Sequence, residues 1–363
     1  MALTSRIALR GPGTDDDEPE DFLNSSLGVI FPDDVTNQHG DANHSLVYTS
    51  PHLRGPLHIA LAEPEGESDR RLFSHYLWNS SLLLAEFVEA GTLGLPLDGG
   101  GGGNGGGSSK GVGGNGADAN PWDVSTFTIR SKSCLELGAG TALPSIMAAL
   151  LGARSVVVTD YPSPAVLDTL RRNVAANGRP ELSPLSLPEV RVCPVTIEGH
   201  AWGDLDSGFA SRYRGGFDRV FVCDCLWMPW QHSNLHRSIA WFLRDDKHEG
   251  EAGEAGEVEG EEEKTENENE NNKSAADVAR AWVIAGFHTG RAKLRGFFDD
   301  GALRDVGLAV ERIWERDCDG VERAWVEDRG AEDPNERKRW LVVAVLKRRS
   351  SSSNSEAEQS RIR

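Results

Sequence analysis

The chain of 363 residues carries a formal net charge of −19 and is long enough for one large domain or two small ones. Because no run of about 18 apolar residues occurs and the N-terminal residues lack the apolar core of a signal peptide, we expect neither a membrane span nor a secretory leader. Acidic residues outnumber basic ones, and the sequence has no stripe of basic residues that could follow a phosphate backbone. Both features argue against nucleic acid as a partner.

The first part of the chain predicts an arm, a hairpin and a helix. Residues 1–45 are polar and acidic and are expected to form a flexible arm. Residues 46–62 contain apolar runs around a proline and a glycine, which is typical of a β-hairpin. Apolar residues at helical spacing then predict a helix over about residues 76–90, with Gly91 as its end.

Two stretches have compositions that cannot join a core. Residues 99–116 contain twelve glycines in eighteen positions and are expected to form a flexible tether. Residues 245–272 carry thirteen acids against two lysines with little to bury, which predicts a disordered insertion. This second stretch contributes −11 of the formal charge of −19, so the remainder has the charge of an ordinary protein surface.

Elsewhere the apolar pattern alternates between strands and helices. Strands are predicted over residues 133–137, 155–160, 191–195, 279–288, 308–315 and 339–347, and another within residues 217–227. Such an alternation predicts a parallel sheet with helices on both faces, while the last two strands should pair as an antiparallel hairpin with no helix between them. We therefore expect one α/β domain over residues 46–348, with the two insertions inside it and a disordered tail over residues 349–363.

Five cysteines are an odd number and follow no disulfide-like pattern. Cys223 and Cys225 lie in an apolar run, and no second pair or nearby histidine stands at zinc-ligand spacing. The sequence therefore predicts reduced, buried thiols, no metal and a cytoplasmic location.

Gly138-Ala139-Gly140 follows one predicted strand and opens the next helix. Glycines there let backbone approach a ligand, and Asp160, at the end of the next strand, is placed to accept hydrogen bonds from two ribose hydroxyls. A dinucleotide site needs a small residue where this chain has Leu143, so the pattern favours S-adenosylmethionine, which needs no phosphate cradle. The alternative is a packing turn with an incidental aspartate.

These residues carry a resemblance to a known family. The stretch LELGAGTALPSIMAALLGARSVVVTDYP resembles the first motifs of seven-stranded S-adenosylmethionine methyltransferases and, more narrowly, family 16 of the lysine methyltransferases. YLWNSSLLLAEFV, AWGD and DCLW stand at the matching places. TDYP and EPEDF resemble a fungal subgroup described as nicotinamide N-methyltransferase-like, whose members are associated with methylation of elongation factor 1-alpha at its N-terminus and an adjacent lysine.

The resemblance implies a Rossmann-like sheet of six parallel strands and one antiparallel strand, in a monomer that binds S-adenosylmethionine. The implied cofactor contacts are Trp78, Gly138, Ala139, Gly140, Asp160, Trp202 and Cys223. The two tryptophans are amphipathic plates that could flank adenine or the methionine arm, and Cys223 would offer backbone near adenine. Either tryptophan could instead fill the core, since the chain has ten.

Asp224 and Trp227 occupy the family's acid-x-x-aromatic motif. The resemblance implies that Asp224 holds the incoming amine and that Trp227 walls its channel. The family usually has tyrosine or phenylalanine at the position of Trp227, which leaves the width of the pocket and the exact substrate open. Asp224 could instead cap the next turn. His288 could line the substrate path or simply pack at a strand end, and we do not count it as catalytic.

Three functions remain open from the sequence. The favoured one is protein N-methylation of a translation factor, elongation factor 1-alpha. The second is N-methylation of nicotinamide or a related small amine, and the third is cofactor binding without catalysis. A lysine amine, with a pKa of about 10.4, costs about 4 kcal/mol to deprotonate near neutral pH, so an N-terminal α-amine is the easier target.

Overall fold

The computed structural model describes residues 2–10, 38–40, 45–62, 76–97, 124–187, 190–245 and 277–349. The predicted tether and, apart from Asp245, the predicted acidic insertion lie outside the described residues. The same holds for the predicted tail apart from Arg349, and for residues 11–37 of the predicted arm.

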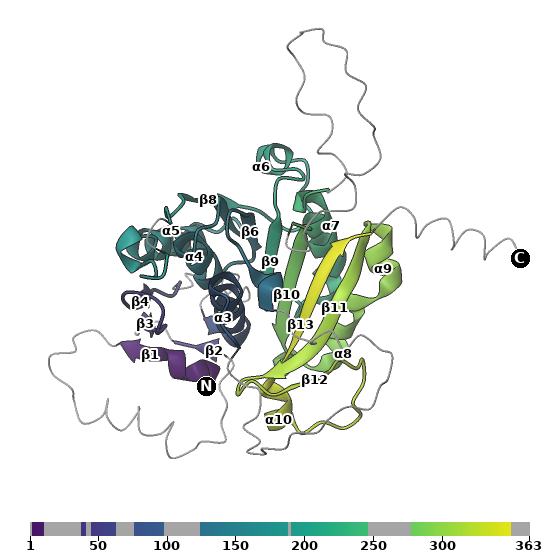
Figure 1. Cartoon of the computed structure of the whole chain (residues 1–363). Coiled ribbons are helices and arrows are strands. Elements are labelled where there is room, and N and C mark those ends of the chain that lie inside the picture. The colour runs from purple at the N-terminus through teal and green to yellow at the C-terminus, as the bar shows by residue number, and fades with distance from the viewer. Residues whose placement is uncertain are drawn as a thin grey trace, which may run out of the picture.

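A mixed sheet forms the centre of the molecule (Figure 1). Its order is β12 (Glu322–Ala324), β11 (Leu308–Asp317), β13 (Trp340–Arg348), β10 (Arg280–Gly286), β9 (Arg219–Cys223), β6 (Ser133–Leu137), β7 (Ser155–Asp160) and β8 (Val195–Gly199). The five strands from β10 to β8 are parallel neighbours, and β13 is antiparallel to both β10 and β11. Because β11 therefore shares the direction of the five, the predicted Rossmann-like sheet of six strands and one opposed strand is confirmed, with β12 added at the edge.

Helices cover both faces of this sheet, as predicted (Figure 1). One face packs against α3 (Asn79–Leu93), α4 (Leu143–Leu150) and α5 (Pro164–Asn177). The other packs against α6 (Gly208–Arg212), α7 (His232–Phe242), α8 (Arg291–Leu294) and α9 (Asp300–Asp305). Short 3₁₀ turns are η1 (Leu3–Arg6), η2 (Val124–Phe127), η3 (Pro180–Leu182), η4 (Pro229–Gln231), η5 (Phe287–Thr289) and η6 (Arg295–Phe298).

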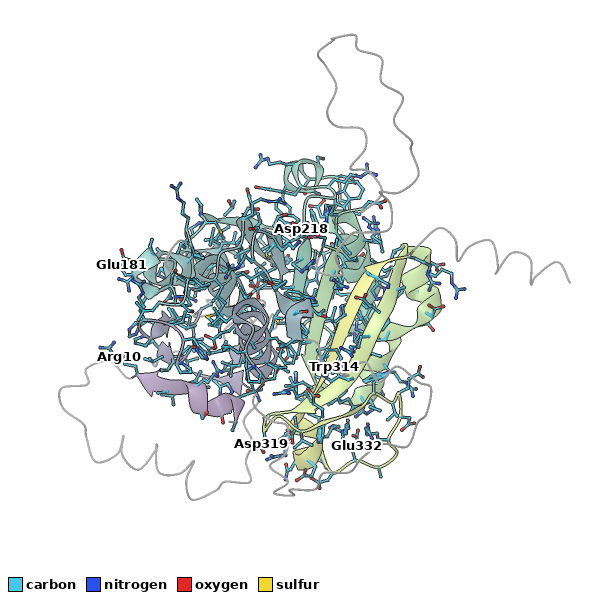
Figure 2. All side chains as sticks on the ribbon, viewed as in Figure 1. Arg10, Glu181, Asp218, Trp314, Asp319 and Glu332 are labelled. Atoms are coloured by element: carbon cyan, nitrogen blue, oxygen red, sulfur yellow. The ribbon has the colours of Figure 1, made fainter. Side chains whose placement is uncertain are left out.

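Side chains of the strands alternate between two hydrophobic cores. In β9, Phe221 and Cys223 join the core under α3 and α4, whereas Val220 and Val222 join the core under α7. Successive residues of a strand point to opposite faces, so a continuous apolar run supplies both cores. Figure 2 shows side chains on both sides of the sheet.

The N-terminal residues differ from the predicted arm. Strand β1 (Ile7–Arg10) pairs with β3 (Ser45–Tyr48). Strand β3 in turn pairs with β4 (Leu57–Ile59), which confirms the predicted hairpin. A separate pair is formed by β2 (Gln38–His39) and β5 (Leu77–Trp78). Leu3 is buried, and the Arg6 guanidinium lies 2.9 Å from the Glu89 carboxylate on α3. The prediction of a flexible arm is therefore wrong for residues 2–10, because an apolar side chain and a cation attach them to the domain.

Two predicted element boundaries are also wrong. Helix α3 continues past Gly91 to Leu93 and ends at Gly94, whose φ of 68° is the left-handed conformation of a helix C-cap. A side chain on Gly91 would collide with the Val124 carbonyl oxygen, so this glycine serves close packing. The strand predicted over residues 191–195 begins only at Val195, because Pro194 has no N–H to give to a ladder.

The C-terminal hairpin is more elaborate than predicted. Strands β11 and β13 pair as expected, but β12 and the short helix α10 (Pro334–Lys338) lie between them. The chain between η5 and β11 is divided into α8, η6 and α9, because the Asp299 carboxylate accepts a hydrogen bond from Ala302 N and starts a new helix.

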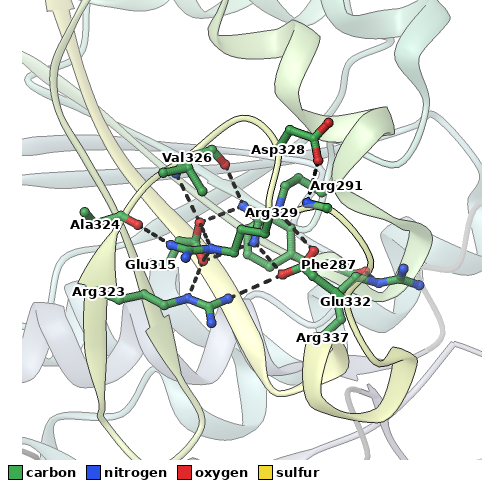
Figure 3. Close-up of polar contacts among 11 residues, drawn as sticks. Phe287, Arg291, Glu315, Arg323, Ala324, Val326, Asp328, Arg329, Glu332 and Arg337 are labelled. Atoms are coloured by element: carbon green, nitrogen blue, oxygen red, sulfur yellow. Dashed lines mark hydrogen bonds and ion pairs between the residues drawn. The ribbon is translucent and has the colours of Figure 1, made fainter.

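A buried ionic cluster joins this hairpin to the segment after β10 (Figure 3). Glu315 of β11 is fully buried and accepts hydrogen bonds from Arg291 at 2.6 and 3.1 Å, from Arg323 at 2.7 Å and from Arg329 at 3.2 Å. Although burial opposes it, these hydrogen bonds and charges hold the pKa of Glu315 below its usual value. Arg291 also pairs with Glu332, so the cluster fixes the chain that follows η5.

We expect Glu315→Gln to lower the free energy of unfolding by about 3 kcal/mol or more, because three guanidinium groups would lose the buried negative charge that they share. Denaturant unfolding would measure the change. Asp300→Asn is the matched control, since Asp300 is an exposed acid that pairs with Arg304 and Arg349, and its loss should cost less than about 1 kcal/mol. Equal losses in the two variants would show that the cluster contributes no more than surface pairs.

Candidate functional site

A cavity of about 230 Å³ lies at the carboxyl ends of the parallel strands. Residues that directly follow β6, β7, β8 and β9 line it, as expected for a ligand site in such a sheet. His288 does not line this cavity, whereas the residues proposed from the sequence as cofactor contacts or for substrate positioning all do: Trp78, Gly138, Ala139, Gly140, Asp160, Trp202, Cys223, Asp224 and Trp227. The structure thus brings together side chains from segments far apart in the chain.

The glycine turn after β6 is shaped by backbone and by space. Gly138 and Gly140 have φ values of 70° and 55°, which favour glycine. A Cβ atom on Gly138 would lie 2.7 Å from the Cys225 Sγ and 2.9 Å from the Trp202 ring. The missing side chain therefore lets the Trp202 indole lie directly against the turn.

Asp160 holds this turn from the end of β7. Its carboxylate accepts hydrogen bonds from Gly140 N at 2.8 Å and from Tyr161 N at 2.7 Å. Burial raises the pKa of Asp160 to about 6, although these two N–H groups favour the ionised form. Each carboxylate oxygen keeps a further lone pair, so the group could accept two more hydrogen bonds from a ligand.

Two tryptophans line the cavity from different elements. Trp78 is the residue before α3, and its ring stacks on the His288 ring with centroids 4.8 Å apart and planes 21° apart. Trp202 follows β8 and lies against Gly138. Both rings are partly exposed and line the cavity, and Trp202 also packs against the core under α7.

Asp224 follows β9 in a conformation that non-glycine residues rarely adopt. Its φ is 55°, and its backbone N donates to the Ile284 carbonyl oxygen of β10 at 2.8 Å. One carboxylate oxygen accepts a hydrogen bond from the Ser80 hydroxyl at 3.0 Å, and the other lies 3.7 Å from the His288 Nδ1. Burial raises the pKa of this carboxyl, while His288, Ser80 and the Gly286 N–H oppose the rise. These partners belong to α3, to the end of β10 and to η5, and they hold Asp224 at the cavity.

Several lining residues were missed from the sequence: Tyr76, Ser81, Tyr161, His200, Ala201, Cys225, Met228, Gln231 and Asn234. Tyr161, Cys225 and Met228 follow strand ends, so the rule that places ligands there could have found them. Gln231 and Asn234 belong to η4 and α7, where no motif marks them.

The charge of the lining selects among ligands. Its carboxylates are Asp160 and Asp224, and no lysine or arginine is among the lining residues. A diphosphate would find no cationic partner there, whereas a cationic ligand with a ribose would find both an acid and aromatic walls. The residues present therefore fit S-adenosylmethionine. Among the described residues, no group of three histidine, cysteine or acidic side chains could hold a metal ion, and no helix has the length and apolar character needed to cross a membrane.

The sheet order and this cavity define the class: a methyltransferase fold that takes S-adenosylmethionine as its cofactor. A family model described as lysine methyltransferase matches residues 66–246, about half of the chain. The resemblance stated from the sequence is thereby confirmed.

Fungal relatives support the same family. A protein N-terminal and lysine N-methyltransferase of Schizosaccharomyces pombe is 28% identical over 202 residues, which cover 52% of this chain and 62% of the relative. A protein of the same description from Neurospora crassa is 33% identical over 32% of this chain and 42% of the relative. Another from Kluyveromyces lactis is 26% identical over 63% of this chain and 71% of the relative. The chain therefore matches less than two thirds of the length of the first two relatives.

We expect the affinity for S-adenosylhomocysteine to fall as the pH drops below about 6, because only the ionised form of Asp160 accepts hydrogen bonds from both ribose hydroxyls. At pH 5 about one tenth of the protein would hold that form, so Kd should be about tenfold higher than at pH 7.5. Calorimetric titration would measure both values.

Asp160→Asn should weaken binding about tenfold or more at pH 7.5 and remove the pH dependence. Asp206→Asn, an exposed acid outside the cavity lining, is the control and should bind like the unmodified protein. An unchanged affinity of Asp160→Asn would contradict the role of this carboxylate.

Proposed function

We propose that the chain is an S-adenosylmethionine-dependent N-methyltransferase that acts, as a cytoplasmic monomer, on amino groups of a protein, with elongation factor 1-alpha as the substrate. The observation that carries this proposal is Asp224, a buried carboxylate fixed at the wall of a cavity without cationic side chains. Such a group selects an amine or ammonium over an anionic substrate. The relatives described as protein N-terminal and lysine N-methyltransferases support a protein amine over a small one.

The proposed division of labour follows the positions of the residues. When bound, the cofactor supplies a methyl group on a sulfonium, ready for in-line displacement by a nitrogen lone pair. Asp160 and the glycine turn would hold the ribose, while Trp78 and Trp202 would exclude water from the cavity. Asp224 would accept a hydrogen bond from an amine N–H and so aim the lone pair at the methyl carbon.

The proton of the substrate must leave before transfer. A carboxylate stabilises the ammonium, so Asp224 orients the amine more than it deprotonates it. An N-terminal α-amine, with a pKa near 8, reaches the neutral form at a smaller cost than a lysine. Both targets are open to this site, with the α-amine favoured.

Methyl-labelled cofactor tests the proposed substrate class. The protein would be incubated with it and, in separate reactions, with elongation factor 1-alpha, with the same factor acetylated at its N-terminus, and with nicotinamide. We expect label in the unmodified factor and a reduced signal after acetylation, with mass spectrometry locating the modified amine. Label in nicotinamide alone would replace the proposal with small-molecule methylation.

We expect Asp224→Asn to reduce kcat about tenfold or more, since asparagine keeps the shape but loses the charge that orients the amine. The affinity for S-adenosylhomocysteine should stay within about twofold. Ser80→Ala, which removes the hydroxyl that fixes this carboxylate, should give a smaller loss of kcat. Full activity of Asp224→Asn on every amine tested would exclude the residue from the site.

A further inference from the structure

Two aromatic side chains are exposed at the same cavity. Tyr161, 52% exposed, and Trp230, 71% exposed, are the aromatic members of the large hydrophobic side chains found exposed in the described ranges. Tyr161 lines the cavity, and Trp230 packs edge-on against Trp227, which also lines it, with centroids 6.5 Å apart. Single exposed apolar residues are common, but exposed rings that gather at the mouth of a ligand cavity are typical of a binding surface.

Trp227, Pro229 and Trp230 form one feature, the aromatic shelf. Pro229 is also exposed, and the shelf runs from the cavity wall outward. The neighbouring residue Gln231 lines the cavity, so the short turn η4 presents one side chain inward and Trp230 outward.

The shelf is held in place by hydrogen bonds around η4. Gln231 N donates to the Met228 carbonyl oxygen at 2.9 Å, and the Gln231 side chain accepts from Asn234 of α7 at 2.8 Å. The His232 ring contacts the Leu226 carbonyl oxygen at 2.9 Å. A surface fixed in this way loses little freedom when a partner covers it, which favours binding.

We propose that the aromatic shelf docks the polypeptide segment that carries the methylated amine. This inference rests on the proposed function and adds the surface by which the protein substrate is recognised. A small amine beside Asp224 would lie inside the cavity, whose lining does not include Trp230. A polypeptide entering the cavity with its amine has to leave it over the rim, where the shelf offers apolar surface.

The geometry also specifies the substrate segment. The acids of the lining suit a cationic end, and the shelf suits an apolar side chain. The preferred substrate therefore has an apolar residue close in sequence to the modified one.

Steady-state kinetics on Trp230→Ala with a protein substrate tests this inference. We expect KM to rise about tenfold, since an exposed tryptophan buried on binding contributes at least that factor, while kcat and the affinity for S-adenosylhomocysteine stay within about twofold. Trp230→Phe should recover most of the loss. Leu185→Ala is the matched control, because Leu185 is 75% exposed but belongs neither to the cavity lining nor to the aromatic shelf, and its KM should not change.

The outcomes separate this inference from the proposed function. If the unmodified protein methylates the protein substrate and Trp230→Ala does so with unchanged KM, the docking surface is wrong and the proposed function stands. If the unmodified protein methylates only nicotinamide, the proposed function fails and the docking surface with it. A melting temperature of Trp230→Ala several degrees lower would show that the ring packs within the fold, which would also overturn the inference.

Discussion

The carboxylate of Asp160 joins the ends of two neighbouring strands, and the cavity takes its shape from that connection. One oxygen accepts a hydrogen bond from the N–H of Gly140, which follows β6, and the other accepts one from the N–H of Tyr161, which follows β7. A backbone hydrogen bond from Ala139 N to the Thr159 carbonyl oxygen, at 3.0 Å, strengthens the same junction. Placing an acid there costs desolvation, which a ribose with two donors would compensate.

The sheet explains why the other groups of the cavity meet at this edge. Parallel strands with alternating side chains supply two cores, so the faces of the sheet are closed by helices and only the strand ends remain for chemistry. Asp224 leaves β9 next to the end of β10, which brings His288 beside it. The buried cluster around Glu315 lies just beyond, where it fixes the chain that continues from η5 (Figure 3).

The strands, the glycine turn and the ribose acid could be predicted because each is a local pattern in the sequence. Apolar runs fix β6 and β7, and twenty residues separate Gly140 from Asp160 in a unit whose geometry is regular. Features that depend on distant contacts could not be predicted in this way. The Arg6 side chain binds Glu89, 83 residues further along the chain, and Ser80 donates a hydrogen bond to Asp224, 144 residues further along. No sequence periodicity predicts either contact.

The buried cysteines have a consequence for a protein that handles a methyl donor. Cys223 and Cys225 both line the cavity, and burial raises the pKa of each thiol well above its usual value of 9.0. The thiolate is the nucleophilic form of cysteine, and at neutral pH these two side chains stay protonated. A sulfonium placed among them would therefore meet sulfur atoms too weakly nucleophilic to take its methyl group. Burial, together with the neighbouring acids, thus keeps both thiols protonated and protects the cavity wall from alkylation.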